Sequence, residues 1–204
     1  MKPLKPPPTW PGGKPRPHKP QSVLPREVRL IGGRWKRSKL PVADRPGLRP
    51  TPDRVRETLF NWLGQDLGGW RVVDAFAGSG ALGFEAASRG AAEVVLIERD
   101  TPLVASLDAT RQRLGAGTLR VVRADAMSWL AAAEPACWDL VLLDPPFDSG
   151  VLMPAAAAGT PLLAPGGYLY LEGREAPPEA LPGLELHRKL RAGAVFATLW
   201  RRVA

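Results

Sequence analysis

The sequence predicts an α/β protein built on a doubly wound sheet. Short apolar runs alternate with helix-like stretches from Trp70 to Asp144, and three β-α units in succession are typical of that architecture. The runs are almost continuous in Val, Leu and Ile, which indicates strands buried on both faces, as parallel strands are. The expected strands are RVVDAF (71–76), EVVLIE (93–98), LRVVRAD (119–125) and WDLVLLD (138–144), with helices within 80–90, 101–114 and 126–133.

The flanks of this pattern predict one further helix and three further strands. Thr51 is expected to cap a helix over 51–63, with Pro52 at its first position and Gly64 ending it. A weak helix and a Pro-Gly-Gly turn are expected within 151–167. The strand YLYLE (168–172) follows, and the terminal pair is LELHRKL (184–190) and AVFATLW (194–200), joined near Gly193.

Charge divides the chain into a basic arm and a slightly acidic body. The 204 residues carry a net charge of +8, but the first 50 hold 13 basic and 2 acidic residues, whereas the rest hold 15 and 18. Such an arm suggests a phosphate-rich partner; a merely solvated tail is the alternative. We expect a disordered, Pro-rich basic tail over 1–25, which holds nine prolines, a basic hairpin over 26–50 and a catalytic domain over 51–204.

Composition argues against several classes of protein. One cysteine, Cys137, permits no internal disulfide, and with only His18 and His187 besides it we expect no metal site and no thiol chemistry. No apolar run approaches the ~20 residues of a membrane span, and prolines interrupt the basic N-terminus. We therefore expect a cytoplasmic protein without a membrane segment.

A glycine-rich segment after the first strand predicts a nucleoside-binding site. Gly78, Gly80 and Gly83 form G-x-G-x-x-G between a strand and a helix, and Glu98 ends the next strand, where it can accept both hydroxyls of a ribose. A nicotinamide dinucleotide fits these residues equally well. Asp74 differs, because a carboxylate there suits the amino group of an amino-acid-bearing nucleoside better than a pyrophosphate, which favours S-adenosylmethionine over NAD.

Asp125 and Ala126 follow the third strand at the same edge of the sheet. The carboxylate can accept from the adenine N6 amino group, and the Ala126 amide can serve a ring nitrogen. The alternative, which is compatible with binding, is that Asp125 caps the following helix.

Asp144-Pro145-Pro146-Phe147, directly after the fourth strand, is the most specific chemical signal. An aromatic amino group is a poor nucleophile unless acceptors hold its hydrogens, and Asp144 and the Pro145 carbonyl can do so while the two prolines fix the backbone. Phe147 can stack on an extruded base. A structural Pro-Pro turn would explain the prolines but not the acid and the aromatic residue beside them.

Basic residues around one tryptophan predict contacts with RNA. Charges with an interleaved aromatic suit phosphate contacts and stacking on an unpaired base. Trp35 has an equally favoured alternative role as hairpin core. The candidates are Arg29, Arg34, Trp35, Lys36, Arg37, Lys39 and, on the following helix, Arg54.

From about Val28 to the C-terminus the chain resembles the RsmD-type bacterial methyltransferases. The resemblance is carried by IGGRWKRSKLPVADRPGLRP, TPDRVRETLFNWL, DAFAGSGALGFEAASRGA, LIERD and DLVLLDPPF. Many amino-methylating enzymes share DPPF, whereas the hairpin and helix motif before it is more particular. The Pro-rich extension is not part of the family pattern.

This resemblance implies a Rossmann-like class I methyltransferase fold with a seven-stranded, mostly parallel sheet. It implies that S-adenosylmethionine methylates the exocyclic N2 of one guanine in 16S rRNA, in the 30S subunit or an assembly intermediate. It implies that Glu98 binds the ribose hydroxyls of the cofactor and that Asp125 binds its adenine. The cofactor loop falls on Asp74, Phe76, Ala77, Gly78, Ser79 and Gly80, and the catalytic segment on Asp144, Pro145, Pro146 and Phe147.

Other functions fit parts of the pattern. A DNA amino-methyltransferase shares the DPPF-type site but would lack a recognition domain in 204 residues. A ribosome-assembly factor with secondary methylation activity fits the charge equally well, and a dehydrogenase is contradicted by DPPF and Asp74. With few residues beyond one fold, we expect a monomer.

Overall fold

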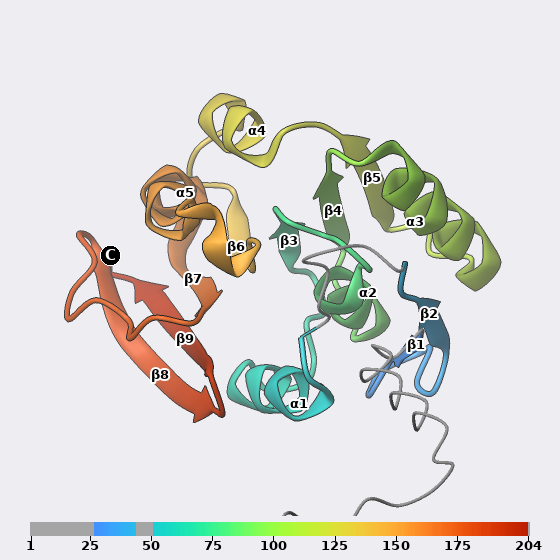
Figure 1. Cartoon of the computed structure of the whole chain (residues 1–204), viewed down its shortest axis with the longest axis horizontal. Coiled ribbons are helices and arrows are strands. Elements are labelled where there is room, and N and C mark those ends of the chain that lie inside the picture. Colours follow the sequence, from blue (N-terminus) through green and yellow to red (C-terminus); the bar gives the residue numbers. More distant parts are fainter. Residues whose placement is uncertain (1–26, 44–50, 204) are drawn as a thin grey trace, which may run out of the picture.

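A seven-stranded sheet forms the centre of the computed structural model, which describes residues 27–43 and 51–203 (Figure 1). The expected tail over 1–25 and the end of the arm over 44–50 lie outside the described residues. All strands run parallel except β9, which is antiparallel to both neighbours. In spatial order the strands are β5 (Leu119–Arg123), β4 (Glu93–Glu98), β3 (Arg71–Asp74), β6 (Trp138–Leu143), β7 (Leu163–Gly173), β9 (Val195–Arg202) and β8 (Leu184–Ala192). The doubly wound expectation is confirmed.

Helices cover both faces of this sheet, and each face has its own apolar core. α1, α2 and α3 pack on one face together with the N-terminal hairpin, and α4 and α5 pack on the other (Figure 1). The helices are α1 (Asp53–Trp62), α2 (Ala81–Ser88), α3 (Thr101–Leu114), α4 (Ala126–Ala132) and α5 (Leu152–Gly159), with 3-10 turns η1 (Phe147–Ser149) and η2 (Thr160–Leu162).

Strand β7 begins earlier than the sequence predicts. Leu163 already pairs with Trp138, and the pairing then jumps to Tyr168 opposite Leu140. The Pro-Gly-Gly segment between these pairs bulges from the strand, and a Cβ on Gly167 would lie 2.9 Å from the Trp138 carbonyl oxygen. The expected turn is therefore an interruption inside a longer strand.

The basic hairpin shares its core with the sheet. β1 (Glu27–Arg29) and β2 (Lys39–Pro41) pair antiparallel, as expected. Val28, Leu30 and Leu40 are buried in the same cluster as residues of α1 and α2. One side of the hairpin consequently packs against α1 and α2.

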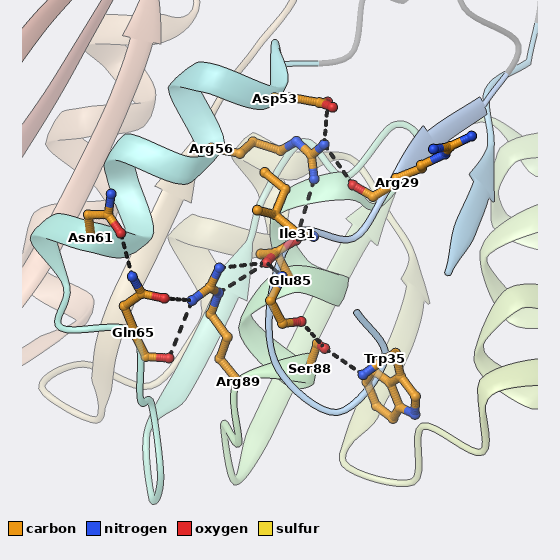
Figure 2. A network of polar contacts seen from close by, with 11 residues as sticks. Arg29, Ile31, Trp35, Asp53, Arg56, Asn61, Gln65, Glu85, Ser88 and Arg89 are labelled. Atoms are coloured by element: carbon orange, nitrogen blue, oxygen red, sulfur yellow. Dashed lines mark hydrogen bonds and ion pairs between the residues drawn. The ribbon is translucent and has the colours of Figure 1, made fainter. Parts of the chain in front are cut away.

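Glu85 of α2, which is fully buried, joins the hairpin loop to two helices (Figure 2). The Ile31 and Gly32 amides donate to its Oε2 and Oε1 at 2.8 and 2.7 Å. Arg89 donates to Oε1 from Nε and Nη2 at 3.0 and 2.9 Å, and Arg56 of α1 donates to Oε2 at 3.4 Å. These donors offset the desolvation of a carboxylate that would otherwise be costly to bury.

The network continues on either side of Glu85 (Figure 2). Arg56 also donates to the Arg29 carbonyl at 2.9 Å and to Asp53 at 2.6 Å. At the end of α2, the Ser88 hydroxyl accepts from the Trp35 amide at 2.9 Å. Gly33 lies against Ser88 with φ +72°, and a Cβ on it would stand 1.8 Å from the Ser88 carbonyl oxygen. Only glycine fits this contact.

Substituting Glu85 by Gln should strongly destabilise the protein. The change removes the counter-charge of the buried Arg89 and one of the two carboxylate partners of Arg56, and we expect the free energy of unfolding to fall by about 3 kcal/mol. Urea unfolding followed by tryptophan fluorescence measures the change. Glu57→Gln, on the exposed side of α1, is the matched control and should shift stability by less than about 0.5 kcal/mol. Equal midpoints for the two variants would contradict the assignment.

Candidate active site

A cleft of about 570 Å³ lies at the carboxyl ends of the parallel strands. The strand order reverses between β3 and β6, and ligands of open α/β sheets bind at such a switch point. Of the predicted residues, the cleft is lined by Asp74, Phe76, Ala77, Gly78, Ser79, Glu98, Asp125, Ala126, Asp144, Pro145, Pro146 and Phe147. Arg99, Asp100, Leu103 and Met127 also line the cleft, although no sequence motif predicts them, and Thr51 lines it as well.

Asp74 ends β3 and is 1% exposed. Its Oδ2 accepts from the Gly83 amide at 3.0 Å, while its Oδ1 has no hydrogen-bond partner among the described residues. Burial, with the nearby Asp144 and Glu98 carboxylates, raises the pKa of Asp74 to about 7. A desolvated carboxylate oxygen on a cleft wall is a suitable acceptor for a ligand's amino group. Asp74 therefore has the chemistry expected of a residue that binds the amino group of S-adenosylmethionine.

The glycine loop holds Glu98 in place. The Gly78 amide donates to Oε2 at 3.0 Å and the Asp100 amide donates to Oε1 at 2.9 Å. Because each carboxylate oxygen has two acceptor positions, Glu98 can still accept from a ribose diol. Gly80 does not line the cleft; it caps α2 with φ +77°, where a Cβ would stand 2.6 Å from the Phe84 ring. Gly80 therefore has a structural role at the start of α2.

Asp125 is the N-cap of α4 and also lines the cleft. Its Oδ1 accepts from the Ser128 amide at 2.9 Å and from the Ser128 hydroxyl at 3.1 Å. These hydrogen bonds lower the pKa of Asp125, so it stays an acceptor at neutral pH. Asp125 therefore caps α4, as the alternative predicts, and it also lies on the cleft wall, where it could bind adenine.

Thr51 does not cap α1. The helix begins at Asp53 after Pro52, with no side-chain cap. The buried Thr51 instead donates its hydroxyl to Asp144 Oδ2 at 2.9 Å. Burial raises the pKa of Asp144 to about 7, and the bond from Thr51 opposes that rise. A distant acceptor, 93 residues along the chain, outcompetes the local cap, and it ties the start of α1 to the predicted catalytic segment.

The segment after Asp144 separates two clefts. Pro145, Pro146 and Phe147 line both the first cleft and a second one of about 490 Å³. Phe147 is half-buried, and the guanidinium carbon of Arg174 lies 4.9 Å from its ring centroid. An aromatic ring in this position can stack on a base that approaches from the second cleft.

None of the predicted RNA-binding residues lines either cleft. Trp35 is half-buried and packs against the core, in line with its alternative role in the hairpin core. The six basic residues are exposed. The Arg34 amide donates to the Ser88 carbonyl at 2.6 Å, which places the hairpin loop at the end of α2 opposite the glycine loop. The eight residues of α2 separate the two sites by roughly 12 Å.

Residues 27–43 and 51–203 contain neither a cluster of metal-ligating side chains nor a helix that could span a membrane. No group of three His, Cys, Asp or Glu side chains there gathers to hold a metal ion. No helix in these ranges is long and apolar enough to cross a bilayer. Cys137 is half-buried, and its Sγ lies 3.2 Å from the Glu134 carbonyl oxygen.

Comparisons with known proteins identify the family. The family model described as Conserved hypothetical protein 95 matches residues 28–201. The Ribosomal RNA small subunit methyltransferase D of Escherichia coli K12 is 43% identical over 182 residues, which cover 87% of this chain and 91% of that protein. The chain belongs to this family.

Other relatives agree with this membership. The protein of the same name from Haemophilus influenzae is 38% identical over 161 residues, 76% of this chain and 83% of that one. The solved structure of the yhhF methyltransferase from Escherichia coli has a TM-score of 0.79 and 41% identity, and the match covers 87% and 99% of the two chains. The predicted RsmD-type family and Rossmann-like methyltransferase fold are confirmed, and enzymes of this class in general use S-adenosylmethionine.

Replacing Thr51 by Val should move the pH dependence of methyl transfer. Loss of the donated hydrogen bond raises the pKa of Asp144, so the acid limb of the rate profile should move to higher pH. The rate at pH 7 should fall about fivefold. Thr51→Ser should restore both properties. Thr58→Val removes a hydroxyl that bonds only the Arg54 carbonyl on α1 and serves as the control. If the acid limb of the pH–rate profile of Thr51→Val stayed where it is in the wild type, Thr51 would have no role in setting the pKa of Asp144.

Replacing Asp74 by Asn should weaken S-adenosylmethionine binding by about tenfold, because a charge-assisted hydrogen bond to the amino group is lost. Ionisation of Asp74 near its raised pKa should also make wild-type affinity rise between about pH 6 and pH 7, and the variant should lose this rise. Titration calorimetry at both pH values measures the two effects. Asp108→Asn, in a surface ion pair with Arg111, should retain wild-type affinity and its pH dependence.

Proposed function

We propose that this chain methylates the exocyclic N2 amino group of a guanine in 16S rRNA, with S-adenosylmethionine as the methyl donor. The observation that carries the proposal is Asp144, held by Thr51 at 2.9 Å and followed by a Pro-Pro-Phe segment between two clefts. Its relatives named Ribosomal RNA small subunit methyltransferase D support this substrate.

The first cleft is the proposed cofactor site. The Asp74 carboxylate would hold the amino group of the cofactor, Glu98 its ribose hydroxyls, and Asp125 and the Ala126 amide its adenine. The loop from Phe76 through Ala77, Gly78 and Ser79 would give the backbone close access to the ligand. When bound, S-adenosylmethionine would supply a methyl group that is activated by its sulfonium. After the transfer, the remainder of the cofactor would leave as a neutral thioether.

Asp144 and the Pro145 carbonyl would prepare the amine for attack. By accepting its two hydrogens they turn the N2 lone pair toward the methyl carbon. A bond would form between N2 and that carbon while the carbon–sulfur bond of the donor would break and leave its electron pair on sulfur. The alkylated amine then loses one proton, which the Asp144 carboxylate, with a pKa raised to about 7, can receive. Phe147 would stack on the extruded base.

The exposed basic residues of the hairpin and α1 would bind the RNA backbone. Because they lie outside the clefts, one substrate must reach both the catalytic segment and the far end of α2. The names of the relatives favour a substrate from the small ribosomal subunit. The protein would act as a monomer on the 30S subunit or its assembly intermediate in the cytoplasm. The proposed contacts are Arg29, Arg34, Trp35, Lys36, Arg37, Lys39 and Arg54.

Transfer of labelled methyl from S-adenosylmethionine to naked 16S rRNA, to a 30S-like particle and, in a separate reaction, to DNA tests the function directly. We expect N2-methylguanosine in the digested product, with the particle preferred. Asp144→Ala should lose at least about a hundredfold in rate while it still binds the cofactor. Full activity of a folded Asp144→Ala protein would exclude the mechanism. Label in DNA but in neither RNA substrate would instead identify a DNA amino-methyltransferase.

A further inference from the structure

Glu172 of β7 is a buried carboxylate that the transfer chemistry leaves without a role. It is 1% exposed and contributes to the wall of the second cleft, together with Pro145, Pro146 and Phe147. Its position on this wall, beside the proposed catalytic segment, makes it a candidate for contact with the substrate.

The strand register sets Glu172 next to Asp144. β6 and β7 are parallel and pair Leu143 with Leu171. Asp144 directly follows the end of β6, and Glu172 is the next residue of β7. Adjacent parallel strands lie about 4.8 Å apart. The two carboxylates consequently leave the sheet side by side at its carboxyl edge.

Tyr170 orients the Glu172 carboxylate. Tyr170 and Glu172 are two residues apart on β7, so their side chains lie on the same face of the sheet. The buried Tyr170 hydroxyl donates to Glu172 Oε2 at 2.8 Å. Burial and the charges of Glu172 and Asp144 raise the pKa of Tyr170 well above its ordinary value. The hydroxyl thus remains a donor, and its hydrogen bond restrains the direction in which Glu172 presents its acceptor positions.

The chemistry of the bases supplies a reason for two acceptors in this place. Adenine and cytosine each carry an amino group beside a ring nitrogen with a lone pair, whereas guanine carries its N2 amino group beside N1–H, a second donor. An acceptor for the amine alone would serve all three bases. A second carboxylate beside it attracts the guanine N1–H and repels the lone pair of the other two.

We propose that Glu172 accepts the N1–H of the target guanine and determines the selectivity of the enzyme for guanine over the other amino-bearing bases. The inference rests on the proposed function and adds a specificity-determining residue to it. Asp144 and the Pro145 carbonyl then accept the hydrogens of the amino group, Glu172 accepts the N1–H beside it, and Phe147 stacks on the base.

A base analogue separates this role from a structural one. The guanine that wild-type enzyme methylates is first mapped and then replaced by 2-aminopurine in a reconstituted 30S-like particle. This analogue keeps the amino group but has a lone pair at N1. Wild-type kcat/KM should favour guanine by about tenfold or more. In Glu172→Gln the amide can donate to N1, so the preference should fall by about tenfold. A merely structural role would lower both rates and leave their ratio unchanged.

Controls make the outcomes distinct. Glu179→Gln removes the same charge from an exposed position outside both clefts and should keep the wild-type ratio. Equal wild-type rates on the two particles would overturn the inference even if Glu172→Gln did not fold. An unchanged ratio in a folded Glu172→Gln protein would overturn it while leaving the proposed function standing. Absence of methylation of the guanine particle by wild-type enzyme would overturn both.

Discussion

The buried Glu85 carboxylate is the constraint on which the rest of the structure depends. It binds the hairpin loop through two amides, α1 through Arg56, and its own helix through Arg89. α2 carries the glycine loop at its N-terminus, and Thr51, just before α1, contacts Asp144. One desolvated charge thus connects the basic hairpin with both walls of the cleft. Burying it is tolerable only because all its partners are present together.

Carboxylates gather at the carboxyl edge of the sheet for a related reason. Asp74, Asp144 and Glu172 lie at the carboxyl ends of parallel strands. Burial raises the pKa of Asp74 and of Asp144, and the nearby Asp144 and Glu98 carboxylates add repulsion at Asp74. A cationic cofactor and an amino group each relieve that repulsion by binding. The exposed hairpin carries the opposite sign, so the charge pattern directs phosphates to the outside and amines to the clefts.

Much of the fold and part of the site could be predicted from local pattern. Alternating apolar runs and helical stretches identify the strands, since side-chain periodicity follows directly from backbone geometry. The segments around Gly78 and Asp144 also carry their chemistry in consecutive residues. Boundaries were less predictable: β7 starts at Leu163 because a bulge, invisible to periodicity, lets the strand resume pairing.

The sequence by itself determined the strands, the glycine loop, the Asp-Pro-Pro-Phe segment and the family to which they belong. Only the tertiary structure decided that Thr51 binds Asp144 rather than capping α1, that Glu85 anchors the hairpin, and that Glu172 stands beside Asp144. Each of these contacts joins segments far apart in the chain. Their partners depend on strand order and register, which arise from packing the whole sheet and leave no trace in local spacing.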